Sequence, residues 1–212
     1  MLEEDERKRT YGGMTRRSLC IGVGGAVAAF GLGTLKPLAA NAVVRPPGGQ
    51  EEDRLLAGCI RCEKCAETCP RGVISLTHIE DGLINMRTPV MDYHYDYCDW
   101  CVEENEGVPL CEHVCPTDAL RLDSASTAAN TILGIAQINE DWCLAYRLKG
   151  CRFCADNCPY GAMYLDENLM PHVIDDRCNG CGLCYTVCVS LEDASAVAGM
   201  TDRAIVVKPV KR

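Results

Sequence analysis

The chain has 212 residues, enough for one domain or two small ones, and 17 of them are cysteine, several times the usual share. Acidic residues outnumber basic ones by 30 to 21, and the formal net charge of −9 argues against a nucleic-acid partner. Only two Phe and two Trp accompany eight Tyr, so cross-links or metals must replace part of an ordinary core.

Residues 1–42 are expected to form a twin-arginine export signal. Arg16 and Arg17 precede a Gly- and Ala-rich apolar stretch that ends at Leu35, and Ala40-Asn41-Ala42 has the form of a signal-peptidase site. The stretch is about 17 residues long, at or below the length that spans a bilayer. This route exports proteins already folded around their cofactors, so it favours a metal over disulfides. We expect a periplasmic or otherwise extracytoplasmic protein, with the signal cleaved or kept as a membrane attachment.

Residues 43–58 are rich in Pro and Gly and read as a linker that passes into a helical turn around Glu51 to Leu56. The remaining chain, residues 59–212, alternates cysteine runs with short periodic segments. A helical turn and a strand are predicted after each run, as at 72–76 and 118–122. This alternation predicts a loop-rich α+β fold.

Strands are also predicted before most cysteine runs, as at 135–138 and 172–174, with hairpin turns at Asp81-Gly82 and Asp166 to Asn168. Such a pattern is typical of the bacterial two-cluster ferredoxin unit. We therefore expect two ferredoxin-like units in one compact protein.

The sixteen cysteines beyond the signal fall into four runs of four, and every run ends in Cys-x-x-x-Cys. The runs are Cys59, Cys62, Cys65 and Cys69; Cys98, Cys101, Cys111 and Cys115; Cys143, Cys151, Cys154 and Cys158; and Cys178, Cys181, Cys184 and Cys188. The first and last have the same uninterrupted spacing, whereas the middle two carry insertions. Proline follows the first three runs, and Val189 follows the last.

Gaps of two, two and three residues followed by proline are the bacterial 4Fe-4S ferredoxin signature. One tight loop can supply three thiolates to a cubane, and the fourth cysteine of the run serves a neighbouring cluster. Zinc would need two Cys-x-x-Cys pairs per ion, Rieske ligation needs two His per cluster, and haem attachment needs a His after Cys-x-x-Cys. The sequence therefore predicts four 4Fe-4S clusters, with disulfides and zinc as the weaker readings.

Spacing does not determine which runs share clusters. Loop closure changes by only about 0.6 kcal/mol per doubling of length, so separation along the chain is neutral. The two uninterrupted runs could pair with each other and the two interrupted runs likewise, which is a nested arrangement. A sequential arrangement of neighbouring runs stays open.

Together, the export signal, RPPG, CIRCEKCAETCP, CLAYRLKGCRFCADNCP and CNGCGLCYTVCV resemble the NapG/MauM type of ferredoxin over nearly all of residues 15–207. That type is a four-cluster electron-transfer subunit associated with periplasmic nitrate reduction. The resemblance implies nested pairing and electron flow from quinol, through a membrane-bound iron-sulfur partner, toward a periplasmic reductase or a c-type cytochrome.

The nested arrangement implies four ligand sets and two lobes, one from residues 59–97 with 170–212 and one from residues 98–169. The sets are Cys59, Cys62, Cys65 and Cys188; Cys178, Cys181, Cys184 and Cys69; Cys98, Cys101, Cys111 and Cys158; and Cys143, Cys151, Cys154 and Cys115.

No catalytic constellation accompanies the cysteines. The sequence has no Ser/His/Asp arrangement, no phosphate loop and no dinucleotide fingerprint that follows a strand. We expect an electron-transfer subunit and not an enzyme. Two other readings stay open: an accessory protein that matures a periplasmic oxidoreductase, and the iron-sulfur subunit of another molybdenum enzyme.

Overall fold

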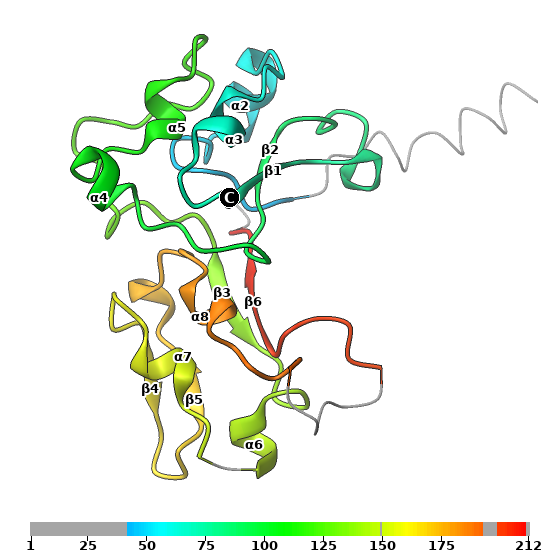
Figure 1. Cartoon of the computed structure of the whole chain (residues 1–212), viewed down its shortest axis with the longest axis vertical. Helices are drawn as coiled ribbons and strands as arrows, with labels where there is room; N and C mark the ends of the chain where they lie inside the picture. The colour runs from blue at the N-terminus through cyan, green and yellow to red at the C-terminus, as the bar shows by residue number, and fades with distance from the viewer. Residues whose placement is uncertain (1–41, 149, 193–198, 211–212) are drawn as a thin grey trace, which may run out of the picture.

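The computed structural model describes residues 42–148, 150–192 and 199–210. Arg16 and Arg17 of the expected export signal lie outside the described residues. The described chain forms two lobes that follow one another in sequence and lie at opposite ends of the molecule's long axis (Figure 1). We call residues 43–122 the N-terminal lobe, residues 135–210 the C-terminal lobe and residues 123–134 the connector.

Short helices and strands build each lobe. The N-terminal lobe contains α2 (Glu52–Gly58), α3 (Lys64–Thr68), β1 (Ile74–Leu76), η2 (Ile79–Asp81), β2 (Pro89–Met91), α4 (Val102–Asn105) and α5 (Leu110–His113). The C-terminal lobe contains β3 (Ile135–Ile138), α6 (Leu144–Leu148), α7 (Phe153–Asp156), β4 (Met163–Leu165), β5 (Pro171–Val173), η3 (Asp175–Arg177), α8 (Leu183–Thr186) and β6 (Ile205–Lys208). Helices this short are not stable alone, so packing must hold them. None of the described helices has the length and apolar character needed to cross a membrane.

Three two-stranded antiparallel sheets support the cysteine loops. In the N-terminal lobe β1 pairs with β2, and in the C-terminal lobe β4 pairs with β5. The expected hairpin turns lie within the connections of these two pairs. The third sheet pairs β3 with the C-terminal strand β6, with Ile138 opposite Ile205, and this pairing brings the end of the chain back into the C-terminal lobe.

The segment after the second cysteine run is not the strand that the sequence predicted. The backbone N–H of Arg121 instead donates to the carbonyl of Gly48 at 3.1 Å. The segment thus contacts a turn near the start of the fold and does not pair with a strand. Gly48 has a φ of +83°, and a Cβ there would lie 2.6 Å from the Arg121 nitrogen. Only glycine fits this close approach.

Residues 43–58 belong to the N-terminal lobe, so the prediction of a linker was wrong, although the helical turn expected around Glu51 to Leu56 is present as α2. The N–H of Met91 donates to the carbonyl of Val44 at 2.8 Å, which places the segment beside β2. Arg45 is only 3% exposed and donates to Glu52, Thr88 and the Pro89 carbonyl. Pro and Gly here fix a buried turn, whereas composition alone suggested a spacer.

The contacts between elements also overturn the nested lobes. Helix α3 packs on α5 and β1 in the N-terminal lobe, while α7 packs on α8 and β4 in the C-terminal lobe. One buried cluster is drawn mainly from residues 44–133, and two others lie between residues 135 and 205. The lobes are therefore consecutive stretches of chain, and the division into 59–97 with 170–212 was wrong.

Candidate metal centres

The sixteen cysteines in the described part of the chain are free thiols, and they gather into four groups of four. The first quartet is Cys59, Cys62, Cys65 and Cys115. The second is Cys69, Cys98, Cys101 and Cys111. The third is Cys158, Cys178, Cys181 and Cys184. The fourth is Cys143, Cys151, Cys154 and Cys188.

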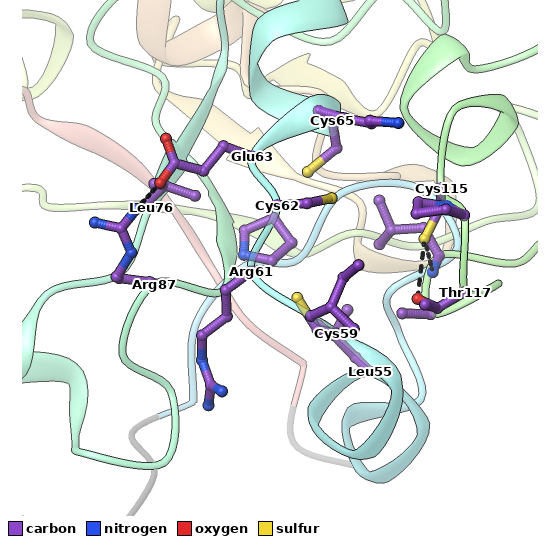
Figure 2. A pocket seen from close by; sticks show the side chains of 16 residues that line it. Leu55, Cys59, Arg61, Cys62, Glu63, Cys65, Leu76, Arg87, Cys115 and Thr117 are labelled. Carbon is purple, nitrogen blue, oxygen red and sulfur yellow. Dashed lines mark hydrogen bonds and ion pairs between the residues drawn. The ribbon is translucent and has the colours of Figure 1, made fainter.

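The first quartet shows how a loop directs three thiols into one space (Figure 2). Cys59 caps the C-terminal end of α2, and the chain then turns tightly through Arg61 and Glu63, which have φ of 58° and 65°. Left-handed backbone at non-glycine residues is uncommon and is kept only where its surroundings impose it. The thiols line a cavity of about 30 Å³ with mostly apolar walls, larger than the roughly 10–15 Å³ that one water needs.

Each quartet takes three cysteines from one run and its fourth from the neighbouring run. Helix α3 carries Cys65 to the first quartet, and its C-cap, Cys69, belongs to the second. Helix α5 returns the exchange, because it holds Cys111 of the second quartet while Cys115 lines the first cavity. The contact between α3 and α5 makes this exchange possible. In the C-terminal lobe, α7 holds Cys154 of the fourth quartet and is followed by Cys158 of the third. Helix α8 holds Cys184 of the third quartet and is followed by Cys188 of the fourth.

The fourth cysteine of each run lies with a neighbouring set, but not with the set that the nested pairing expected. Cys115, not Cys188, completes the set of Cys59, Cys62 and Cys65. Cys188 lies instead with Cys143, and Cys158 with Cys178. Matching insertions record the length of a loop and carry no information about which helices pack together.

The remaining nested assignments change in the same way. Cys69 was expected with Cys181 and lies with Cys98, while Cys115 was expected with Cys143. The first three cysteines of every run lie together in one quartet, as predicted.

Burial makes several of these thiols poor acids as long as no cation lies between them, whereas at Cys115 hydrogen bonds outweigh burial and lower the pKa of the thiol. Burial, with the charges of neighbouring thiolates, raises the pKa of Cys65 and Cys181 to about 11. The same causes raise the pKa of Cys98 and Cys154 to about 12. Metal ligation requires the thiolate, and a positive group between the sulfurs removes this penalty. A cationic core between the sulfurs would therefore offset the cost of ionising these buried thiols.

Several sulfurs accept hydrogen bonds from the chain. Backbone N–H groups of Leu120, Ala136 and Ala162 donate to the Sγ of Cys115, Cys178 and Cys158 at 3.5, 3.4 and 3.3 Å. Such bonds stabilise negative charge on ligand sulfur and tune the reduction potential of iron-sulfur centres.

The described residues hold no set of three or more His, Cys, Asp or Glu side chains arranged around a single metal ion. The thiols of the first, third and fourth quartets instead each line a shared cavity, as a group larger than one ion requires. The donor set, the shared fourth ligand and the N–H to sulfur bonds all fit a cubane iron-sulfur cluster.

Comparison with known proteins agrees with this geometry. The profile of the 4Fe-4S dicluster domain family matches residues 58–119 and 149–190. MauM of Methylobacillus flagellatus, a methylamine utilization ferredoxin-type protein, is 30% identical over 92% of this chain and 85% of its own. The ferredoxin-type protein NapG of Escherichia coli is 30% identical over 89% of this chain and 80% of its own. The chain belongs to the MauM/NapG family of ferredoxin-type proteins.

Family membership settles two of the predictions. Ferredoxin-type proteins transfer electrons through 4Fe-4S domains and are not enzymes, as the sequence indicated. The first dicluster match also spans the first two runs together, which agrees with consecutive lobes.

Proposed function

We propose that this MauM/NapG family member holds one 4Fe-4S cluster in each quartet, four in all, within two ferredoxin-like α+β units. The observation that carries the proposal is the exchange of the fourth cysteine in both lobes, which is the arrangement that the two-cluster ferredoxin signature predicts. A disulfide framework would join sulfurs in pairs, and zinc would draw two close pairs around one ion. A cubane needs four separated thiolates, which is what each quartet offers.

The proposed role is to pass single electrons between other redox proteins. Bound clusters supply the redox chemistry, while the chain supplies the thiolates, the N–H donors and the burial that set the potential. We propose export by the twin-arginine route, with electrons entering from a membrane-bound quinol-oxidising iron-sulfur protein. A periplasmic reductase of nitrate reductase type, or a c-type cytochrome, would receive them.

A maturation role is the second candidate, because relatives named for methylamine utilization match as well as NapG does. The two roles differ in timing. A carrier is needed at every turnover, whereas a maturation factor becomes dispensable once its client is active.

The deciding experiment starts with a fully matured periplasmic oxidoreductase that is encoded beside the gene for this protein. The anaerobically purified, reduced protein is mixed with this enzyme and its substrate in a stopped-flow instrument. The carrier role predicts reoxidation that requires the substrate and continues over many turnovers. A mature enzyme that turns over fully with its membrane donor and never oxidises this protein would contradict the role.

A further inference from the structure

The second and third quartets meet at the boundary between the lobes. The backbone N–H of Cys98, in the second quartet, donates to the carbonyl of Cys181, in the third, at 2.8 Å. A single backbone hydrogen bond therefore joins ligand residues that are 83 positions apart in the sequence and belong to different lobes. The first quartet shares helices α3 and α5 with the second, and the fourth shares α7 and α8 with the third.

Tyr93 lies at this boundary and is 6% exposed. It comes from the segment between β2 and Cys98, and its hydroxyl donates to the carbonyl of Gly180 at 2.6 Å. Its ring fills the space beside Gly182, where a Cβ would lie 2.0 Å from the Tyr93 ring. Gly180 and Gly182 flank Cys181. The Tyr93 side chain of the N-terminal lobe therefore contacts the loop of the C-terminal lobe on both sides of this cysteine.

Other contacts tie the lobes together independently of Tyr93. The neighbouring His94 packs edge-on against Tyr185 with ring centroids 5.3 Å apart. The connector is attached by the Leu133 N–H, which donates to the Asn179 carbonyl at 2.8 Å, and by the Asn179 amide, which donates to the Ala128 carbonyl at 2.7 Å. Removing Tyr93 should therefore loosen the boundary without separating the lobes.

We propose that Tyr93 is a positioning residue that holds the second and third quartets next to each other, so that electrons pass through the four quartets in the order first, second, third, fourth. This inference rests on the proposed function, because it needs a cluster in each quartet. One electron crosses the boundary at a time: the group on one side is oxidised, the group on the other is reduced, and no bond forms or breaks. The four quartets then form one linear electron-transfer chain, with the first and the fourth quartet at its ends.

The test is EPR of the fully reduced protein, in which neighbouring paramagnetic clusters interact magnetically. The interaction between the second and third clusters is identified as the component of the EPR spectrum that is lost in both Cys101→Ser and Cys181→Ser. We expect Tyr93→Ala to weaken that component and to keep the interactions within each lobe. Tyr146→Ala is the matched control, since its hydroxyl also donates to a carbonyl, that of Pro171 at 3.3 Å, but within the C-terminal lobe.

A second pair of variants guards against a folding defect in Tyr93→Ala. Gly182→Ala should weaken the same interaction by displacing the tyrosine ring, whereas Gly107→Ala should not, because its φ of +80° is close to the +89° of Gly182 and its Cβ would meet nothing within 4 Å. Tyr93→Phe should leave the clusters intact and weaken the interaction less than Tyr93→Ala does, because the ring beside Gly182 is kept and only the hydrogen bond to Gly180 is lost.

The outcomes separate the two proposals. Protein that contains no clusters would overturn the proposed function itself. Intact clusters with an unchanged interaction in Tyr93→Ala and Gly182→Ala would overturn the positioning role alone. Intact clusters with no component lost in both Cys101→Ser and Cys181→Ser would overturn the proposed order.

Discussion

Cys65 and Cys69 lie at helix α3 only one turn apart, yet they belong to different quartets. The same relationship recurs at α5, α7 and α8, so every pair of neighbouring quartets within a lobe is connected by two short helices. A helix of this kind carries a cysteine of one quartet and is followed at its C-terminal end by a cysteine of the other. It keeps the two quartets of a lobe close together.

Serine in place of Cys69 should therefore disturb the second quartet. Serine is a poorer ligand to iron than thiolate, so Cys69→Ser should shift or remove one cluster and leave three recognisable. We expect the EPR component lost in Cys69→Ser during a redox titration to be the one lost in Cys101→Ser. Cys115→Ser should correspondingly match Cys62→Ser. A Cys69→Ser spectrum that coincides with that of Cys181→Ser would restore the nested pairing.

Ser190 should raise the reduction potential of the fourth centre. Its hydroxyl oxygen lies 3.2 Å from the Sγ of Cys188 and also accepts the N–H of Ala204 at 2.8 Å, which leaves the hydroxyl proton for the sulfur. That bond is stronger when the centre is reduced and carries more negative charge, so Ser190→Ala should lower the reduction potential. The expected shift is some tens of millivolts, which corresponds to a fraction of the free energy of one charged hydrogen bond. An EPR-monitored titration checks it, with the third centre as internal control. A potential that rises or does not change would contradict the assignment.

Arg45 should be the most sensitive charged residue of the N-terminal lobe. Its guanidinium is buried and donates to Glu52, Thr88, Asn85 and the Pro89 carbonyl, although the Glu52 side chain is 39% exposed. Arg45→Ala should lower the free energy of unfolding by roughly 2–3 kcal/mol, because it removes a buried guanidinium together with its hydrogen bonds and leaves the Glu52 carboxylate without its partner. Loss of visible absorption in guanidinium chloride measures the effect.

The control for Arg45→Ala is Arg152→Ala. Arg152 forms an exposed pair with Asp156 four residues along, and such pairs contribute only about 0.3–0.5 kcal/mol. Equal sensitivity of the two variants would show that the buried network does not anchor residues 43–58.

The export signal can be tested separately from the clusters. Replacing Arg16 and Arg17 together with Lys should leave a cluster-loaded protein in the cytoplasm, since the export machinery reads the arginines as a pair. Cell fractionation followed by iron analysis of each fraction gives the answer. Undiminished protein in the periplasm would rule out the twin-arginine route.

The sequence predicted the parts of the centres that are local. Three cysteines of each quartet come from one run, so spacing identified them, and the strands at β1, β3 and β5 followed from short alternating segments. The shared fourth cysteine was also predictable from the signature. Its destination was not, because the packing of α3 on α5 depends on contacts that loop lengths do not reveal.

The boundary between the lobes shows the same limit. In the sequence, Tyr93 does not differ from the other aromatic residues near the second run, and the glycines around Cys181 look like part of a cluster loop. Nothing local indicates that Gly182 leaves room for a ring from 89 residues earlier in the chain. Likewise, the Pro and Gly of residues 46–49 look like spacer composition until Arg121 is seen to pair with Gly48.

Anaerobic metal and sulfide analysis of the full chain tests the central claim most directly. Four quartets with one cubane each predict about sixteen irons and sixteen acid-labile sulfides per chain, with Cys62→Ser and Cys151→Ser each affecting one cluster and leaving the other three. A protein that contains stoichiometric zinc, or eight disulfides and no iron, would contradict the account.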